Sequence, residues 1–169
     1  MTDVHRWLAA HGAQDLPHAG GSLYDHLLRV HAWITDLGLG PTLALAGLTH
    51  AAYGTDGFTT ALTSHDDRGT LRALIGADAE AIVYRYGACD RDRTWPHLAE
   101  TAQVTDRFTG RTGTLGPADL RDFADLTILN ELDVAAHDPG IAAEHGAYFR
   151  RLFTSWAPIA SPQVSAQVR

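Results

Sequence analysis

The chain has 169 residues, of which 45% are hydrophobic and 20% charged, and its net charge is −7. This length and composition are typical of one globular domain. The acidic balance argues against nucleic acid as a partner, because binding phosphates needs a basic surface. All thirteen positively charged side chains are arginine. Without lysine, the chain can form neither a lysine Schiff base nor a Walker A phosphate loop.

The cysteine content and the pattern of apolar residues indicate the cellular compartment in which we expect the protein. The single cysteine, Cys89, cannot form an internal disulfide, which fits a reducing compartment. No apolar run is long enough to span a bilayer, and residues 1–8 lack the basic-then-apolar pattern of a secretory signal. We therefore expect a cytoplasmic protein that acts on a small molecule and has neither a nucleic-acid nor a membrane partner.

In chain order, glycine and proline divide the sequence into segments with apolar residues at three- and four-residue spacings. The helices that we predict cover residues 3–11, 23–37, 41–52, 68–75, 78–86, 95–108, 117–136 and 141–156. The third of these is apolar on almost every side, so we expect it to be buried. Alternation with period two is not convincing anywhere, although residues 109–116 could form a small hairpin. The sequence predicts an all-α domain over residues 1–156 and a loosely ordered tail at 157–169.

Two of the ten histidines face the apolar side of predicted helices. His26 has apolar residues three before and four after it, and His50 follows others at spacings of seven, four and three. Because the two helices are consecutive, they should pack antiparallel and let the imidazoles meet. Each histidine taken alone could be a satisfied core residue. Together they indicate a site, since neutral imidazole is the commonest side-chain ligand of transition metals.

The residues around these histidines resemble the HD superfamily. The segments 26–31 (HLLRVH) and 45–51 (LAGLTHA) are similar to the opening of that domain, where one helix begins with a histidine and the next ends in a His-Asp pair. The stretch 47–58 looks like that of a bacterial branch with a GLxHxxYGT motif. The late helix at 123–133 is similar to the element that supplies a final aspartate. The resemblance covers residues 14–136 and implies an HD-like helical bundle.

The sequence departs from the HD pattern in its metal ligands. Ala51 stands where the family has an aspartate, and Asn130 where it has the final one, with Asp133 three residues further on. The resemblance therefore implies a reduced site of His26, His50 and Asp133. Such a set could hold one divalent transition metal, either iron, manganese or zinc, with open positions. A metal-free site is the alternative, and a two-metal hydrolase is disfavoured because the bridging aspartate is missing.

Three further residues are candidates for contacts with a substrate. His18 could supply a further nitrogen, and Asn130 is a polar group on an otherwise apolar helix, where it needs a partner. Arg68 could bind a carboxylate or phosphate in a bidentate manner. For Arg68, a place on a solvated helix face explains the sequence more simply.

The residues that follow His50 are candidates for catalysis. His50 could act as an acid or base, Asp56 could orient it or act as a base, and Tyr53 could donate a hydrogen bond. They lie where a buried helix gives way to a loop, a natural mouth for a pocket. In the alternative interpretation, Tyr53 caps the core and Asp56 makes a turn.

Two functions remain open from the sequence. The favoured one is a small-molecule enzyme with an HD-like pocket lined by His26 and His50, working by oxygenase-type, hydrolase-type or metal-free acid–base chemistry. The other is a degenerate HD-like ligand-binding or regulatory domain without catalysis, in which the two histidines are relics held by hydrogen bonds.

Overall fold

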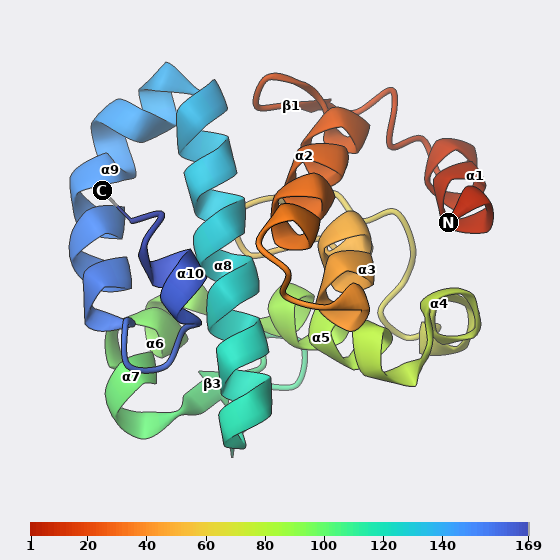
Figure 1. Cartoon of the computed structure of the whole chain (residues 1–169). Coiled ribbons are helices and arrows are strands. Elements are labelled where there is room, and N and C mark those ends of the chain that lie inside the picture. The colour runs from red at the N-terminus through yellow and green to blue at the C-terminus, as the bar shows by residue number, and fades with distance from the viewer. Residues whose placement is uncertain (169) are drawn as a thin grey trace. The chain divides into compact units, whose positions relative to one another are not determined.

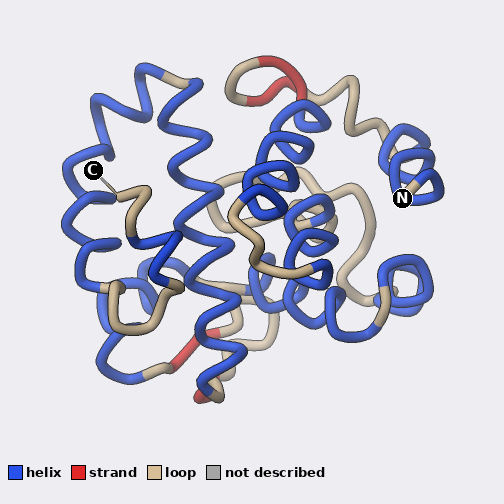
Figure 2. The backbone as a smooth tube through the Cα atoms, in the orientation of Figure 1, coloured by secondary structure: helices blue, strands red, loops and turns tan. Residues whose placement is uncertain are grey.

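The computed structural model describes residues 1–168 and is mostly helical (Figure 1). Figure 2 shows how little of the described chain is strand, and the strands form two antiparallel pairs. The prediction of a mostly helical chain is confirmed. Contacts divide the chain into two compact units, Met1–Gly87 and Ala88–Arg169, which are described separately below. The sequence predicted a boundary before residue 157, whereas the contacts place one after Gly87.

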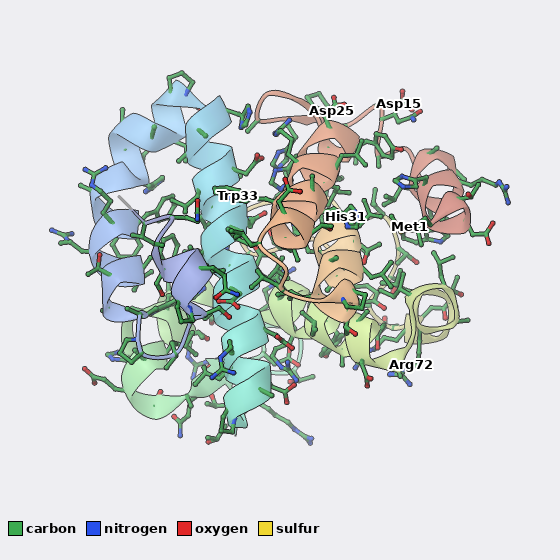
Figure 3. All side chains as sticks on the ribbon, in the orientation of Figure 1. Met1, Asp15, Asp25, His31, Trp33 and Arg72 are labelled. Atoms are coloured by element: carbon green, nitrogen blue, oxygen red, sulfur yellow. The ribbon has the colours of Figure 1, made fainter. Side chains whose placement is uncertain are left out.

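The first unit contains a small hairpin among its helices. Its elements are α1 (Thr2–Ala10), β1 (Pro17–His18), β2 (Gly21–Ser22), α2 (Leu23–Asp36), α3 (Pro41–Thr49), α4 (Arg68–Ile75) and α5 (Ala77–Ala88). Helix α2 begins with a capping box: the Ser22 hydroxyl accepts from the Asp25 backbone N–H, and the Asp25 carboxylate accepts from the Ser22 backbone N–H. Asp25 marks this end of α2 in Figure 3.

Helices α2 and α3 pack closely in the core of the first unit. Leu27, Val30 and Ile34 of α2 are fully buried, and α3 is buried on nearly every side, as its apolar sequence predicted. A Cβ added at Gly47 of α3 would lie 2.5 Å from Cδ1 of Ile34. The absence of a side chain at Gly47 therefore lets the backbone of α3 approach α2, one helical turn before His50.

The second unit is built on two long helices. Its elements are α6 (Arg91–Thr94), the 3-10 helix η1 (Trp95–His97), α7 (Leu98–Thr101), β3 (Gln103–Thr105), β4 (Thr112–Thr114), α8 (Pro117–His137), α9 (Pro139–Ser155) and α10 (Pro162–Ser165). The continuous helix predicted at 95–108 is wrong. Its first residues form η1 and α7, Ala102 takes a left-handed conformation that ends α7, and β3 follows. The hairpin suggested at 109–116 exists, but its first strand begins earlier.

The C-terminal segment is more ordered than expected. Residues 157–168 include α10, and Val164 is fully buried. The backbone N–H and the hydroxyl of Ser161 both donate to the carboxylate of Asp125 on α8, over 2.8 and 2.6 Å. The prediction of a loosely ordered tail, made from its prolines and small polar residues, is therefore wrong. Hydrogen bonds from Ser161 to a buried carboxylate hold the segment against α8.

No helix within residues 1–168 has both the length and the apolar character needed to cross a membrane.

Candidate functional site

The side chains of His26 and His50 meet inside the first unit. His26 is on α2, and His50 caps the C-terminal end of α3. Their exposed fractions are 0% and 2%, and their Nε2 atoms are 3.3 Å apart. The ring planes are almost perpendicular, at 84°. The predicted convergence of the two imidazoles is confirmed.

A backbone contact fixes the protonation pattern of the His50 ring. Its Nδ1 lies 2.8 Å from the carbonyl oxygen of Gly47. Because a carbonyl oxygen only accepts hydrogen bonds, Nδ1 carries the proton. In neutral His50 the lone pair is consequently on Nε2, the atom that lies within hydrogen-bond distance of Nε2 of His26. That lone pair can accept a proton, accept a hydrogen bond or bind a metal ion.

Aromatic rings surround the histidine pair within the first unit. The His18 ring stacks on that of His26, with centroids 4.3 Å apart, and Phe58 meets His18 edge to face at 5.1 Å. Tyr86 of α5 lies edge to face against His50 at 5.3 Å. His18 and Phe58 are half-buried. The structure thus brings His18, expected as a substrate contact, against the pair.

Tyr53 and Arg68 meet at a residue that we did not single out from the sequence, Glu80 of α5. Glu80 has no exposed surface. Arg68 binds its carboxylate through two parallel bonds of 2.6 and 2.8 Å, the Tyr53 hydroxyl donates over 2.9 Å, and Arg72 donates over 3.1 Å. The Arg68 guanidinium also lies over the ring of Tyr84, 3.8 Å from its centroid.

This network sets the ionisation of its members. Burial opposes ionisation of Glu80, but hydrogen bonds from Arg68, Tyr53 and Arg72 outweigh it and hold the pKa of Glu80 below its ordinary value. Burial, together with the hydrogen bond to Glu80, raises the pKa of Tyr53 far above its ordinary value. Glu80 is therefore a carboxylate and Tyr53 a neutral hydrogen-bond donor at neutral pH.

Asp56, the third residue expected in catalysis, lies in an exposed tight turn. The backbone of Thr55 and Phe58 closes this turn, with N–H to O distances of 2.7 and 3.2 Å. Asp56 is exposed within it, which also agrees with the alternative interpretation of a turn-forming residue. The turn places Phe58 against the ring of His18.

Asn130 and Asp133 lie on α8 of the second unit and are both buried. The Asn130 amide donates to the carboxylate of Glu131 over 2.8 Å, and Glu131 pairs with Arg91 at 2.9 Å. The Asp133 carboxylate lies 3.4 Å from Nδ1 of His137. The roles expected for Asn130 as a substrate contact and for Asp133 as a metal ligand stay predictions.

The donor atoms of the first unit fit part of a metal site. Two nitrogens bound to zinc at 2.0–2.1 Å with tetrahedral geometry would be separated by about 3.3–3.4 Å, and the Nε2 atoms of His26 and His50 are 3.3 Å apart. Within residues 1–168, no group of three or more His, Cys, Asp and Glu side chains is arranged to hold a metal ion. The two imidazoles thus fit two positions of a coordination sphere.

Residues 7–91 match a protein family described as a domain of unknown function, DUF6817. The chain belongs to the DUF6817 family. The matched segment contains the histidine pair, the rings around it and the network of Glu80, whereas Asn130 and Asp133 lie outside it. No curated protein and no solved structure matches the chain. In this DUF6817 protein, the two clusters of the first unit are therefore features of the segment that defines its family.

Glu80 could have been found from the sequence by its position on a helix face. It lies three and four residues from Val83 and Tyr84 and directly after buried Ala79, so α5 turns it toward the core. A buried carboxylate needs cationic partners. Arg68 and Arg72 are four residues apart and thus share one face of α4, which could have supplied them.

Proposed function

We propose that this DUF6817 protein is a small-molecule enzyme with an HD-like helical fold, centred on the histidine pair. The observation that supports it is the 3.3 Å separation of the Nε2 atoms of two buried imidazoles from different helices. The two ring nitrogens pair with each other over this distance, and imidazole nitrogens are the groups that most often serve as acid–base catalysts or as ligands of a transition metal. The resemblance of residues 14–136 to HD domains gives the same centre.

The pair is suited to a single divalent transition metal: iron, manganese or zinc. The separation of the two nitrogens equals the edge expected of a tetrahedral site, and the Gly47 carbonyl orients His50 as an outer-shell acceptor orients a metal-bound histidine. When bound, such a metal would polarise a substrate oxygen or lower the pKa of a bound water. Because Ala51 stands in place of an aspartate ligand, water and substrate would take the coordination positions of the metal that the two histidines leave open.

The chain's own residues contribute in either form of the enzyme. The Nδ1–H of His50 donates to the Gly47 carbonyl oxygen, and Nε2 of His50 faces Nε2 of His26. Without metal, this lone pair makes His50 a general base, with His26 as the neighbouring donor. His18 and Phe58 exclude water on their side of the pair, and the fully buried ring of His26 is held by α2.

Metal analysis tests the proposal on the whole chain. Protein purified without chelator is expected to carry iron, manganese or zinc in stoichiometric amount. His26→Ala and His50→Ala should each lose it, because each removes one of two nitrogen ligands. The matched control is His31→Ala, which removes a half-buried imidazole from the same helix α2 where its Nδ1 contacts the Ala44 carbonyl at 2.9 Å.

Metal content and turnover together distinguish a metal centre, a metal-free enzyme and a ligand-binding domain. Metal that survives in both His26→Ala and His50→Ala, with helical content intact by circular dichroism, would contradict a metal centre at the pair. Absence of metal from wild-type protein, even after addition of iron, manganese or zinc, would leave the metal-free enzyme and the ligand-binding domain. Turnover of small-molecule esters and amides by wild type, abolished in His50→Ala, would then favour the enzyme.

The ligand-binding domain is the second candidate, and Ala51 is the residue that favours it. An HD-like domain that has lost an aspartate ligand holds a metal less well, whereas the rings around the histidine pair can still contact a bound molecule. Binding without turnover, detected by a ligand-induced rise in melting temperature in wild type and in His50→Ala alike, would support this candidate.

A further inference from the structure

Helix α5 holds the segment that follows His50 at two places. At one end, Glu80 accepts the hydrogen bond of the Tyr53 hydroxyl. At the other end, Gly87 approaches the same segment so closely that an added Cβ would lie 2.8 Å from the Gly54 carbonyl oxygen. Because α5 makes both a hydrogen bond and a close backbone contact with this segment, it cannot slide along the segment without breaking one of the two.

The same helix also contacts His50 directly. The Tyr86 ring of α5 lies edge to face against the His50 ring, with centroids 5.3 Å apart. Tyr86 is 3% exposed and His50 2%, so the contact is well inside the first unit. The position of α5 is thus coupled both to the ring of His50 and, through Tyr53, to the backbone that continues from it.

Glu80 is fixed more firmly than a single hydrogen bond would fix it. Its two carboxylate oxygens receive the fork of Arg68 and a third bond from Arg72, both on α4. Tyr53 therefore donates to a carboxylate whose position α4 and α5 determine together. Bidentate, charge-assisted hydrogen bonds of this kind are directional as well as strong.

From this geometry we infer that Glu80 and Tyr53 are positioning residues of the histidine site: Glu80, held by Arg68, anchors Tyr53 and so fixes the orientation of the His50 ring. The sequence led us to expect that Tyr53 donates a hydrogen bond in catalysis. The inferred role is different, because the Tyr53 hydroxyl donates its hydrogen bond to Glu80. It rests on the proposed function only in calling the histidine pair a site.

The conservative variant Tyr53→Phe provides the test. It removes one oxygen, leaves the ring in place and keeps Glu80 paired with both arginines, so the chain should fold. The readout is the set of long-range ¹H–¹⁵N NMR signals of the histidine rings, which report the tautomer and the environment of each ring nitrogen. We expect the ring signals of His50, assigned with His50→Asn, to shift in Tyr53→Phe and in Glu80→Gln, and those of His31 to stay unchanged.

A merely structural role would give a different result. Leu71→Ala removes a fully buried side chain of α4 in the same unit, but it removes none of the hydrogen-bonding groups of the network, so it should lower stability through packing alone. If the His50 signals of Tyr53→Phe move no more than those of Leu71→Ala, the inference is overturned. A second readout is Co²⁺ affinity, which Tyr53→Phe should weaken about two- to thirtyfold, the usual range for coupling through a packed network.

These two readouts distinguish the two proposals. If wild-type protein binds no Co²⁺, the metal centre fails, while the NMR comparison of Tyr53→Phe with Leu71→Ala still decides the role of Tyr53. If Co²⁺ binds equally well to wild type and Tyr53→Phe and the His50 signals coincide, the metal centre stands and the positioning role is rejected.

Discussion

Glu80 places a negative charge where no solvent reaches it; Arg68 and Arg72 balance the charge, and Tyr53 adds a hydrogen bond. The partners differ in exposure: the side chains of Arg68 and Arg72 are 31% and 51% exposed. Solvent therefore screens the arginines more than it screens Glu80. The ion pairs consequently contribute less to the free energy of unfolding than fully buried pairs would.

The stability of the first unit should depend on pH through Glu80. Because its pKa is lower in the folded chain than in the unfolded one, its contribution is fully present above the ordinary pKa of glutamate and is lost as pH falls through the lowered value. Glu80→Gln should lack this acid-sensitive part and cost about 2–4 kcal/mol at neutral pH. Urea unfolding of both proteins at several pH values measures the effect.

Asp78→Asn is the control for that experiment, since Asp78 is an exposed acid on the same helix. It should change the free energy of unfolding by less than about 0.5 kcal/mol. Parallel pH profiles for wild type and Glu80→Gln would show that another group governs the acid response.

At the residue scale, spacing along a helix predicted which side chains turn inward but not what they meet. His26 and His50 face the core as expected, because three- and four-residue spacing fixes a helix face. Tyr53 also turned inward, yet its partner Glu80 lies 27 residues away. No local pattern connects the two, since the packing of α5 brings them together.

The close packing of α2 and α3 is the feature on which the histidine pair depends at the scale of elements. Gly47 sits at this contact, and its carbonyl also accepts the hydrogen bond of His50. A side chain there would clash with the end of the buried Ile34 side chain, so the packing between α2 and α3 would have to adjust one helical turn from His50.

Gly47→Ala should therefore destabilise the chain and disturb the pair together. Its Cβ would clash with Ile34, and overpacking of this kind costs about 1–3 kcal/mol. Chemical denaturation measures the loss, and metal content or Co²⁺ affinity should fall with it. Thr42→Ala, at an exposed position of the same helix, should leave both unchanged. Equal stability of Gly47→Ala and wild type would mean that the side chains around Gly47 make room for the methyl group without cost, and would contradict the prediction.

The second unit shows where element prediction fails. Residues 95–108 carry apolar residues at helical spacing, but Ala102 adopts φ 54° and the chain turns into β3. Alanine is the best helix former and gives no sign of a left-handed position. The stop coincides with the start of the β3–β4 hairpin, whose strand pairing a helical spacing of apolar residues does not reveal.

At the scale of the whole molecule, each of the two units has its own core. In the second unit, Trp95, Phe149, Phe153 and Trp156 form an aromatic cluster with centroid distances of 5.3–6.5 Å. The C-terminal segment joins this unit through Ser161 and Asp125. The mostly helical class followed from the sequence, whereas the division after Gly87 did not, because it falls within α5 and no glycine- or proline-rich linker marks it.

Ser161→Ala should loosen the C-terminal segment. It leaves a carboxylate oxygen of buried Asp125 without the hydroxyl donor, at a cost of about 1–3 kcal/mol. Limited proteolysis should then cut within residues 157–168 faster than in wild type. Ser165→Ala is the matched control: within residues 1–168 its buried hydroxyl has no hydrogen-bond partner, so its removal should be neutral or stabilising. Equal cleavage of Ser161→Ala and wild type would contradict the anchor.

The hairpin that carries His18 is tied to the helix that carries His26. Arg29 of α2 donates to the Ala19 carbonyl over 2.7 Å, and the Leu23 N–H donates to the Leu16 carbonyl over 2.8 Å. The two stacked rings consequently belong to one stiff body and should shift in concert.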